Sequence, residues 1–460
     1  MKRFLRYFLV FAAFFYTLGA IAQDQPALRG QHKAKKKETI FGIARMYDLS
    51  LEELLQANPE MKQPGYELKK GTIVNIPFPG AVRQEEAQPA PVVASEAPRQ
   101  YSRPDDVQKR AIRVGVMLPL HNVNGDGRRM VEYYRGILMA CDSLKQMGIS
   151  IDIRAWNTAE DADISKVLED KAAAECDIIF GPLYSKQMPA LSDFVTAHDI
   201  RLVIPFSINA PQLQTNRNIF QIWQSPSAVN EATIASYMED FRSCHPVFID
   251  CNDSTSRKGI FTTGLRQQLD ARRIAYSLTN LKSSEEAFSK AFDRKKRNIV
   301  ILNTGRSPEL GVAFAKINGL KLNEPTLDIA MFGYTEWLMY TRPHLDNFFK
   351  YSTYIPSVFY YNPLTTLTER LEQNYRWNFR ADMQQSLPRF ALTGFDHAFF
   401  FLRGLHKYGK NFSGAAGMFG YAPVQTPLAF KRVGDGGQQN HSLLFVHYTP
   451  EHRIDVIRKK

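Results

Sequence analysis

From Ile112 to the end of the chain, short strand-like runs alternate with longer helix-like runs, and this alternation constrains the fold more than any other feature. Residues 112–120 have the alternating pattern of a half-buried strand. Residues 129–147 then carry apolar side chains at helical spacing and end at Gly148, a residue typical of helix C-termini. A second strand is expected over 149–156. Strands that alternate with helices in this way predict βαβ units and a parallel sheet.

The pattern continues well beyond the length of one ordinary core. The remaining expected elements are helices over 162–175, 187–198, 227–242 and 259–271 and strands over 177–180, 202–205, 247–249, 273–277 and 298–302. At about 350 residues, this part of the chain exceeds what a single hydrophobic core normally organises. We therefore expect two α/β lobes.

The first 22 residues have the features of a secretory signal peptide. Three basic residues precede an apolar run over 7–18, and Ala20-Ile21-Ala22 offers the small residues that a signal peptidase reads. The apolar run is shorter than the ~20 residues that a membrane-spanning helix needs, which argues against an uncleaved anchor. Cleavage after Ala22, with no cysteine nearby, predicts a soluble periplasmic protein without a lipid anchor.

Residues 30–78 form a compact patterned segment, and residues 79–108 form a Pro- and Ala-rich stretch without a usable period. The compact segment predicts a strand near 32–37, two short helices and a closing strand that ends at Pro77. The stretch that follows has the composition of an extended linker. The order strand, helix, helix, strand describes a small independent domain.

This small segment resembles a LysM domain, the module that binds N-acetylglucosamine in peptidoglycan or chitin. The matching residues span the whole segment and are Thr39-Ile40, Ile43-Ala44, Tyr47, Leu54, Asn58-Pro59, Leu68, Gly71, Ile73 and Ile76-Pro77. The Gly-Asp that usually precedes the threonine is Lys37-Glu38 here. In that family the sugar lies in a groove between the loop before the first helix and the loop before the last strand.

The resemblance implies glycan-binding residues on both of these loops. On the first loop they are Glu38, Thr39, Ile40 and Phe41. On the second loop they are Asn58, Pro59, Tyr66, Glu67 and Leu68. Ile40, Ile43 and Tyr47 also have the spacing of core residues, so the loop residues alone bear on sugar binding.

The large C-terminal part, residues 109–460, resembles the type I periplasmic binding proteins. The residues that carry this resemblance are Ile112–Leu120, Gly181-Pro-Leu-Tyr-Ser185, Ile204-Pro-Phe-Ser207, Ser225-Pro-Ser227 and Gly394-Phe-Asp396 in a helix over 391–408. The resemblance implies an α/β protein with two Rossmann-like lobes, preceded by the small βααβ LysM domain. Lobe 1 is expected over about 109–224 and 353–411, and lobe 2 over about 225–352 and 412–460.

A ligand is expected in the cleft between the lobes, because open α/β sheets bind ligands at the carboxyl ends of their strands. Ser185 opens a helix after a strand, where its hydroxyl and the free N–H groups suit a carboxylate. Serine at such a position is more commonly a helix N-cap, and that alternative stays open. Ser207 and Asn209 end the next strand, and Tyr334 and Glu336 offer an aromatic ring and a carboxylate from the second lobe.

The amino-acid-binding branch of this family holds the α-carboxylate and α-amino groups of its ligand at matching positions. The resemblance therefore implies a small ligand such as an amino acid or a muropeptide, or an envelope protein partner. The sequence has no G-x-S-x-G, P-loop or H-E-x-x-H motif, so we expect no enzyme activity, no catalytic residue, no metal and no cofactor.

The net charge of +12 does not point to nucleic acid in an exported protein. Loss of Lys2, Arg3 and Arg6 with the signal peptide leaves +9 of that charge. The remaining charge lies in scattered runs and favours contact with anionic envelope polymers.

Three function hypotheses follow from these features. The first is a non-enzymatic peptidoglycan-binding protein whose two-lobed domain recognises a small ligand or an envelope partner. The second is the solute-binding component of an amino-acid ABC transporter. The third is a protein-binding regulator of cell-wall synthesis.

Overall fold

The structure is a computed structural model that describes residues 28–35, 38–47, 49, 51–63, 66, 68–77, 106–206, 210–363, 365–418 and 420–459. The expected signal peptide over 1–22 and most of the expected linker lie outside these residues. The chain divides into two compact units, Met1–Arg99 and Gln100–Lys460.

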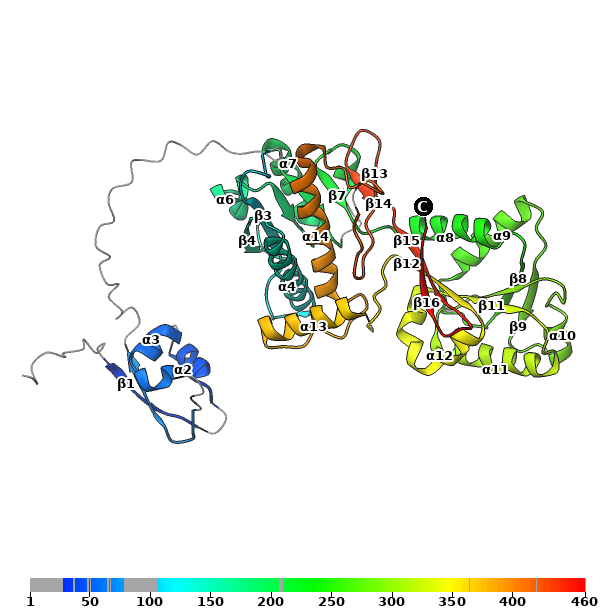
Figure 1. Ribbon diagram of the computed structural model, residues 1–460, viewed down its shortest axis with the longest axis horizontal. Helices are drawn as coiled ribbons and strands as arrows, with labels where there is room; N and C mark the ends of the chain where they lie inside the picture. Colours follow the sequence, from blue (N-terminus) through cyan, green and yellow to red (C-terminus); the bar gives the residue numbers. More distant parts are fainter. Residues whose placement is uncertain are drawn as a thin grey trace, which may run out of the picture. The chain divides into compact units, whose positions relative to one another are not determined.

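The N-terminal unit is a two-stranded antiparallel sheet with short helices between its strands (Figure 1). Its elements are β1 (Leu28–Lys33), α2 (Ile40–Met46), α3 (Leu51–Gln56), η1 (Pro59–Lys62) and β2 (Ile73–Pro77). Apolar side chains from all of its helices pack on the sheet, and Ile43, Leu54 and Val74 are fully buried. The expected order of strand, two helices and strand is confirmed, although the first strand lies four residues earlier than expected.

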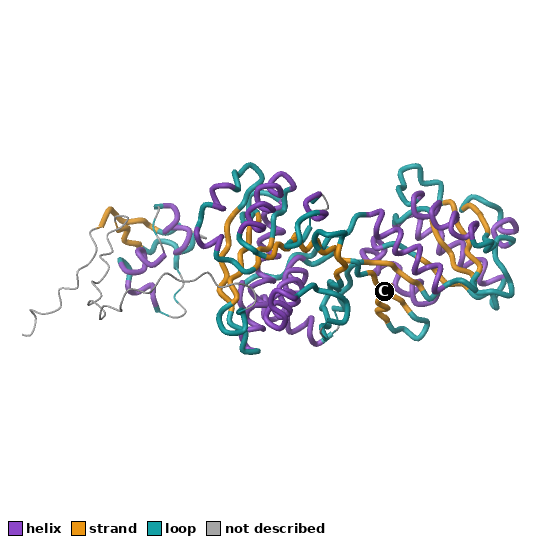
Figure 2. Tube along the Cα trace, turned by 90° about the horizontal axis from the view of Figure 1, so that it is seen from above, coloured by secondary structure: helices purple, strands orange, loops and turns teal. Residues whose placement is uncertain are grey.

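The C-terminal unit contains two seven-stranded sheets, each flanked by helices, which form lobe 1 and lobe 2 (Figures 1 and 2). The first sheet has the order β13-β14-β7-β6-β5-β3-β4, and the second has the order β16-β15-β12-β11-β10-β8-β9. Strands β3 to β7 and strands β8 to β12 pair in parallel. The expected α/β class with two lobes is confirmed.

Lobe 1 takes its first elements from 106–224 and its last from about 360–440. The first set is β3 (Ile112–Leu118), α4 (Gly125–Gln146), β4 (Ile151–Asn157), α5 (Ser165–Leu168), α6 (Lys171–Ala174), β5 (Ile178–Phe180), η2 (Ser185–Gln187), α7 (Met188–Ala197), β6 (Arg201–Ile204), η3 (Pro211–Gln214) and β7 (Ile219–Gln221). The second set is α13 (Thr366–Phe379), α14 (Phe390–Tyr408), η5 (Gly409–Asn411), β13 (Phe430–Arg432) and β14 (Gln438–Asn440).

Lobe 2 consists of 225–357 and 443–459. Its elements are α8 (Pro226–Asp240), β8 (His245–Asp250), α9 (Gly259–Ala271), β9 (Ser277–Asn280), α10 (Glu285–Ser289), β10 (Asn298–Leu302), α11 (Ser307–Asn323), β11 (Ile329–Phe332), η4 (Thr335–Tyr340), α12 (Thr341–Lys350), β12 (Thr353–Ser357), β15 (Leu443–Tyr448) and β16 (Ile454–Lys459).

Alternation along the central strands of lobe 1 divides their side chains between two cores. Val116 and Phe180 face the core that contains α4 and α14, whereas Met117 and Ile179 face the core that contains α7. A strand buried on both faces is the normal consequence of parallel pairing covered by helices. The apolar composition of these strands therefore follows from their central position in the sheet.

Two expected lobe boundaries are wrong. Strand β12 was expected to begin the return to lobe 1 at 353, but it pairs with β11 and β15 in the lobe 2 sheet. Residues 412–440 were expected in lobe 2, but β14 pairs with β7 in the lobe 1 sheet. The ring of Phe430 lies 5.4 Å from that of Phe220, so aromatic packing adds to the pairing that keeps this segment in lobe 1.

The expected linker is also too long at its C-terminal end. Val107 is 1% exposed and packs in the lobe 1 core, so the lobe begins before residue 109. Nearby, the guanidinium of Arg110 donates hydrogen bonds to the carboxylates of Asp106 and Asp177, at 2.9 and 2.6 Å. These contacts tie the segment that begins the lobe to the strand region near β5.

The expected helix over 162–175 is instead two single-turn helices, α5 and α6. Asp170 lies between them in an extended conformation and accepts a hydrogen bond from the N–H of Ala172 at 2.9 Å. An aspartate that caps a new helix in this way ends the preceding one. Similarly, α4 begins at Gly125 rather than Arg129, because Asn124 caps it through the N–H of Gly127 at 2.8 Å.

Candidate binding sites

The first LysM loop is held by a polar network that starts at Glu38. Its carboxylate accepts hydrogen bonds from Nε2 of His32 at 2.9 Å and from the N–H of Lys35 at 2.7 Å. The bond with His32, followed by the bond with Lys35, lowers the pKa of Glu38. The other ring nitrogen of His32 lies 3.0 Å from the hydroxyl of Tyr47. Glu38, implied as a glycan contact, therefore connects the loop to β1 and to the end of α2.

The remaining described residues of this loop have mixed exposure. Thr39 is exposed, and its hydroxyl accepts the N–H of Gly42 at 3.0 Å, which caps α2. Ile40 is half-buried against the domain core. The backbone of Phe41 lies in α2, but its side chain lies outside what the structure describes.

The second LysM loop contains a buried residue that the resemblance implied as a glycan contact. Asn58 is fully buried, and its amide nitrogen donates to the carbonyls of Leu54 and Asn75 at 2.7 and 2.8 Å. Its amide oxygen accepts the N–H of Asn75 at 2.8 Å. The side chain of Asn58 thus joins α3 to β2 and does not face a groove.

The other implied residues of the second loop are distributed around the same core. Pro59 is exposed at the start of η1. Tyr66 and Leu68 are half-buried and pack against the core of the domain. Glu67 lies outside the described residues.

Replacing Asn58 by alanine is expected to lower the free energy of unfolding of the LysM domain by about 2–4 kcal/mol, because three buried main-chain groups lose their partner. A domain of this size has little more stability than that, so much of it should unfold. Hydrogen exchange of residues 28–77 in the full chain measures the effect. Gln63→Ala, an amide truncation at an exposed position, is the control. Equal protection in both variants would contradict the structural role of Asn58.

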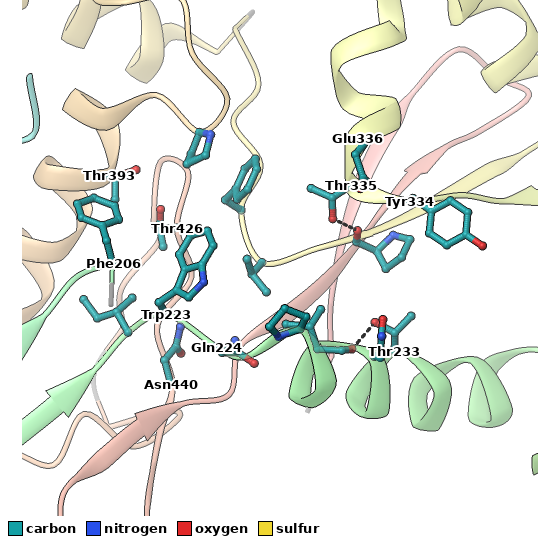
Figure 3. Close-up of a pocket in the computed structure, with 18 of the residues that line it drawn as sticks. Phe206, Trp223, Gln224, Thr233, Tyr334, Thr335, Glu336, Thr393, Thr426 and Asn440 are labelled. Atoms are coloured by element: carbon teal, nitrogen blue, oxygen red, sulfur yellow. Dashed lines mark hydrogen bonds between the residues drawn. The ribbon is translucent and has the colours of Figure 1, made fainter. Parts of the chain in front are cut away.

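The C-terminal unit has a cavity of about 350 Å³ between its lobes. It lies beyond the carboxyl ends of β6 and β7 in lobe 1 and of β11 and β12 in lobe 2, where open α/β sheets bind ligands. Most of its wall is apolar, with the aromatic residues Phe206, Trp223, Phe261, Tyr334 and Phe359 and the prolines Pro205, Pro226, Pro356 and Pro388. Figure 3 shows Phe206, Thr393 and Thr426 on the lobe 1 side and Tyr334, Thr335 and Glu336 on the lobe 2 side.

Both predicted lobe 2 residues, Tyr334 and Glu336, line this cavity. The hydroxyl of Tyr334 donates to the carbonyl of Leu302 at 2.5 Å, and burial raises its pKa well above the usual value. The carboxylate of Glu336 accepts Nζ of Lys258 at 2.6 Å, and the same ammonium lies 4.7 Å from the centre of the Tyr334 ring. The two charges of this wall therefore already neutralise each other.

The lobe 1 wall is built on α14, through the adjacent residues Asp396 and His397. The buried carboxylate of Asp396 accepts the hydroxyl of Tyr421 at 2.6 Å and the N–H groups of Val424, Gln425 and Thr426 at 2.8, 2.7 and 2.7 Å. Burial raises the pKa of Asp396 to about 6, against the lowering effect of these bonds. Asp396 thereby holds the segment that carries Thr426 against α14.

His397 and Thr426 both line the cavity and both contain a buried polar atom without a hydrogen-bond partner within the described chain. These atoms are Nε2 of His397 and Oγ1 of Thr426. The other ring nitrogen of His397 lies 3.0 Å from the hydroxyl of Tyr133. Burial lowers the pKa of His397 to about 3, so its ring is neutral at physiological pH.

Of the three predicted lobe 1 residues, Ser185 is the one that the structure describes. Ser185 starts η2 and does not belong to the described wall of the cavity. Tyr184, not Ser185, occupies the N-cap position of η2. Ser207 and Asn209 lie outside the described residues.

Sequence reasoning missed the aromatic wall and the pair His397 and Thr426. A signal for the wall was present, because Phe206 and Trp223 come within two residues of the ends of β6 and β7. His397 follows the Gly394-Phe-Asp396 motif directly. No pattern in the sequence connects His397 to Thr426, because their proximity depends on the bonds made by Asp396.

The described residues also bear on metal sites and membrane-spanning helices. Among them, no group of three or more His, Cys, Asp or Glu side chains is placed to hold a metal ion. None of the helices that they form has the length and apolar character that crossing a membrane requires.

Comparison with known proteins finds similarity for both parts of the chain. The family described as "LysM domain" matches residues 32–77. A search of curated protein sequences found no match. A solved structure assigned to a branched-chain amino acid ABC transporter from Rhodospirillum rubrum has 14% sequence identity and a TM-score of 0.51, and the match covers 76% of this chain and all of that one.

Two further structures are similar with TM-scores below 0.5. LpoA from Haemophilus influenzae has 12% identity and a TM-score of 0.48, over 76% of this chain and 59% of LpoA. An ABC transporter substrate-binding protein from Sphaerobacter thermophilus has 12% identity and a TM-score of 0.43, over 76% of this chain and 97% of that one. At such low identities, similarity of structure shows the fold and not the ligand. Residues 32–77 are therefore a LysM domain, and the C-terminal unit has the fold of the type I periplasmic binding proteins.

Proposed function

We propose that this protein is a non-enzymatic, exported envelope protein that attaches to peptidoglycan through its LysM domain and binds a small ligand between the lobes of its C-terminal unit. The signal-peptide pattern of the first 22 residues and the LysM match support the location and the wall attachment. The interlobe cavity is the observation that carries the ligand-binding part of the proposal.

The cavity has the properties of a small-molecule site. Its volume of about 350 Å³ falls within the range of about 300–1,000 Å³ that such sites occupy. Its wall is mostly apolar and contains a few polar groups from both lobes, which is the usual composition of a ligand pocket. Because both lobes contribute, a ligand bound here contacts both and links its occupancy to their relative position.

Wall attachment is tested by sedimentation with purified peptidoglycan sacculi. The protein from residue 23 onward is expected to sediment with the sacculi. A variant that lacks residues 23–105 is expected to bind the sacculi at least about tenfold more weakly and to stay in the supernatant, because the deletion removes the LysM domain. Soluble N-acetylglucosamine oligomers should release the intact protein. Equal sedimentation of both proteins would overturn this part of the proposal.

Charge attraction needs a separate control, because the protein is basic and sacculi are anionic. Sedimentation at about 0.15 and 0.5 M salt separates the two effects, since added salt screens interactions between exposed charges. Binding through the LysM domain should persist at the higher salt concentration. Binding that disappears there would indicate attraction of the whole basic chain.

Ligand binding is tested by thermal-shift screening with amino acids and muropeptides. A ligand that binds only the folded unit raises its melting temperature with concentration. A saturable shift with a free amino acid would favour the alternative of an amino-acid transporter component. Co-purification of an envelope protein, without a shift from any small molecule, would favour a regulator of wall synthesis.

A further inference from the structure

We propose that the interlobe cavity takes an uncharged ligand with an aromatic or apolar body and a carbonyl-type oxygen, which is bound at the lobe 1 wall by His397 and Thr426. This inference rests on the proposed function, because it names the chemical class of the ligand expected in the same cavity. It adds two polar contacts that the expected amino-acid site does not contain.

Two buried polar atoms of the cavity wall have no hydrogen-bond partner among the described residues. Nε2 of His397 and Oγ1 of Thr426 both belong to residues of the cavity wall, which are 1% and 7% exposed. Buried polar atoms in folded proteins are nearly always hydrogen-bonded, because leaving one unpaired costs free energy. Two such atoms on one wall of one cavity indicate where a ligand makes its polar contacts.

The hydrogen bond between Tyr133 and His397 determines which group the ligand offers. Tyr133 is fully buried, and Nδ1 of His397 is the described partner of its hydroxyl. Burial raises the pKa of Tyr133 well above its usual value, so the phenol keeps its proton. If Tyr133 donates to Nδ1, only Nε2–H remains unpaired, whereas the other tautomer also leaves the phenol proton unpaired. The favoured tautomer makes Nε2–H a donor, which requires an acceptor oxygen on the ligand.

Charge on the wall favours a neutral ligand. Lys258 and Glu336 are the ionised side chains among the described residues of the cavity, and they form an ion pair at 2.6 Å. His397 is neutral because burial lowers its pKa to about 3. A free amino acid would bring an ammonium and a carboxylate into this apolar cavity without an unpaired counter-charge, which is costly.

The aromatic wall favours a flat or apolar ligand body. The ring centre of Phe206 lies 6.4 Å from that of His397, and Phe206 lines the cavity together with Trp223. Phe359 and Phe261 line it from the lobe 2 side. Aromatic rings in such a site contribute contact area and geometric preference for a second ring. A ligand whose ring packs against this wall would direct its carbonyl oxygen toward His397 and Thr426 in lobe 1.

Isothermal titration calorimetry of the full chain with N-acetyl-L-phenylalaninamide and with L-phenylalanine tests this proposal. The two probes share the aromatic ring but differ in charge. The capped, uncharged probe is expected to bind one site with a Kd of about 1 mM or tighter, and free phenylalanine at least about tenfold more weakly. Tighter binding of free phenylalanine, or no binding of the capped probe at millimolar concentration, would overturn the proposal.

Two variants test the named contacts. Thr426→Val is expected to weaken binding of the capped probe about fivefold while leaving the melting temperature unchanged or raised, because it removes a buried hydroxyl that has no partner among the described residues. His397→Phe is expected to weaken binding about tenfold, with some loss of stability through Tyr133. Thr366→Val, an exposed substitution on α13, is the matched control and should leave Kd unchanged.

The result for Thr426→Val separates ligand contact from structural support, since only a contact lowers affinity without lowering stability. An unchanged Kd in this variant would refute the named site even if the capped probe binds. Failure of this inference is also distinguishable from failure of the proposed function. Binding of a free amino acid in the cavity would refute the uncharged ligand class but keep the ligand site, and sedimentation with sacculi is independent of both.

Discussion

Replacing Gly136 by alanine is expected to destabilise lobe 1 by about 2–4 kcal/mol, at or above the usual cost of overpacking a core. Helices α4 and α14 lie side by side in this lobe (Figure 1). Where they touch, Gly136 faces the backbone of α14 and Gly394 faces the backbone of α4. A Cβ on Gly136 would lie 1.9 Å from the carbonyl oxygen of Ala391, and one on Gly394 would lie 2.0 Å from that of Tyr133. Because the obstacles are main-chain atoms, no side chain can rotate away to relieve them.

Gly319→Ala is the matched control for this prediction. Gly319 lies on an exposed face of α11, and nothing would contact an added Cβ within 4 Å. Alanine in an unstrained helical position should raise stability by about 0.4–1 kcal/mol. Urea unfolding of the three proteins measures the opposite signs. A Gly136→Ala variant as stable as the Gly319→Ala variant would show that the helices do not approach as closely as described.

Replacing Asp396 by asparagine is expected to cost about 3–5 kcal/mol at neutral pH, because a buried acceptor of four hydrogen bonds loses half of its accepting capacity. The asparagine amide would turn its NH₂ group toward N–H donors of residues 424–426. The segment that carries Thr426 would then lose its attachment to α14. The variant should therefore also bind the capped probe more weakly than Thr426→Val does.

The dependence of this effect on pH has a definite sign. The pKa of Asp396 is raised in the folded protein to about 6, above the unfolded value near 3.8. A raised pKa means that the folded protein binds the proton more tightly, so the group contributes most stability below about pH 4. That contribution is lost as pH rises through about 6, and it amounts to about 3 kcal/mol for a shift of this size. The stability gap between the natural protein and Asp396→Asn should therefore widen when the pH is lowered from 7 to 4.

Asp193→Asn serves as the control, because Asp193 is exposed on α7. Unfolding of all three proteins by urea at pH 4 and pH 7 gives the required differences. The Asp193 variant should follow the natural protein at both values. A gap that narrows toward pH 4 would mean that the hydrogen bonds to the Asp396 carboxylate outweigh the cost of its burial.

Elements defined by local pattern were predicted well. Helix α9 over Gly259–Ala271 and strand β10 over Asn298–Leu302 have the expected bounds. In both, the spacing of apolar residues along the chain matches the face that is buried, for example Phe261, Leu265 and Leu269 on α9. Errors arose where one polar residue acted on the backbone, as Asp170 does between α5 and α6.

The candidate-site residues show the same contrast between what local pattern predicts and what contacts in the folded protein decide. Tyr334 and Glu336 were predicted as an aromatic ring and a carboxylate from the second lobe. The structure places both in the cavity wall, directly after the carboxyl end of β11. Asn58 was implied as a glycan contact by its place in the LysM pattern, whereas its hydrogen bonds to α3 and β2 give it a buried structural role. Position in a motif does not distinguish a residue that binds a ligand from one that supports the loop beside it.

The sequence by itself determined the order strand, helix, helix, strand of the small domain and the α/β class of the part that follows it, because periodicity and capping depend on residues that are neighbours along the chain. Only the tertiary structure decided that β12 stays in lobe 2 and that β14 joins lobe 1, since sheet pairing is a contact between distant segments. The same reason applies to the cavity wall. His397 and Thr426 share it because the carboxylate of Asp396 binds three successive N–H groups from a segment about thirty residues away, where each contact lowers the free energy only after the chain has folded.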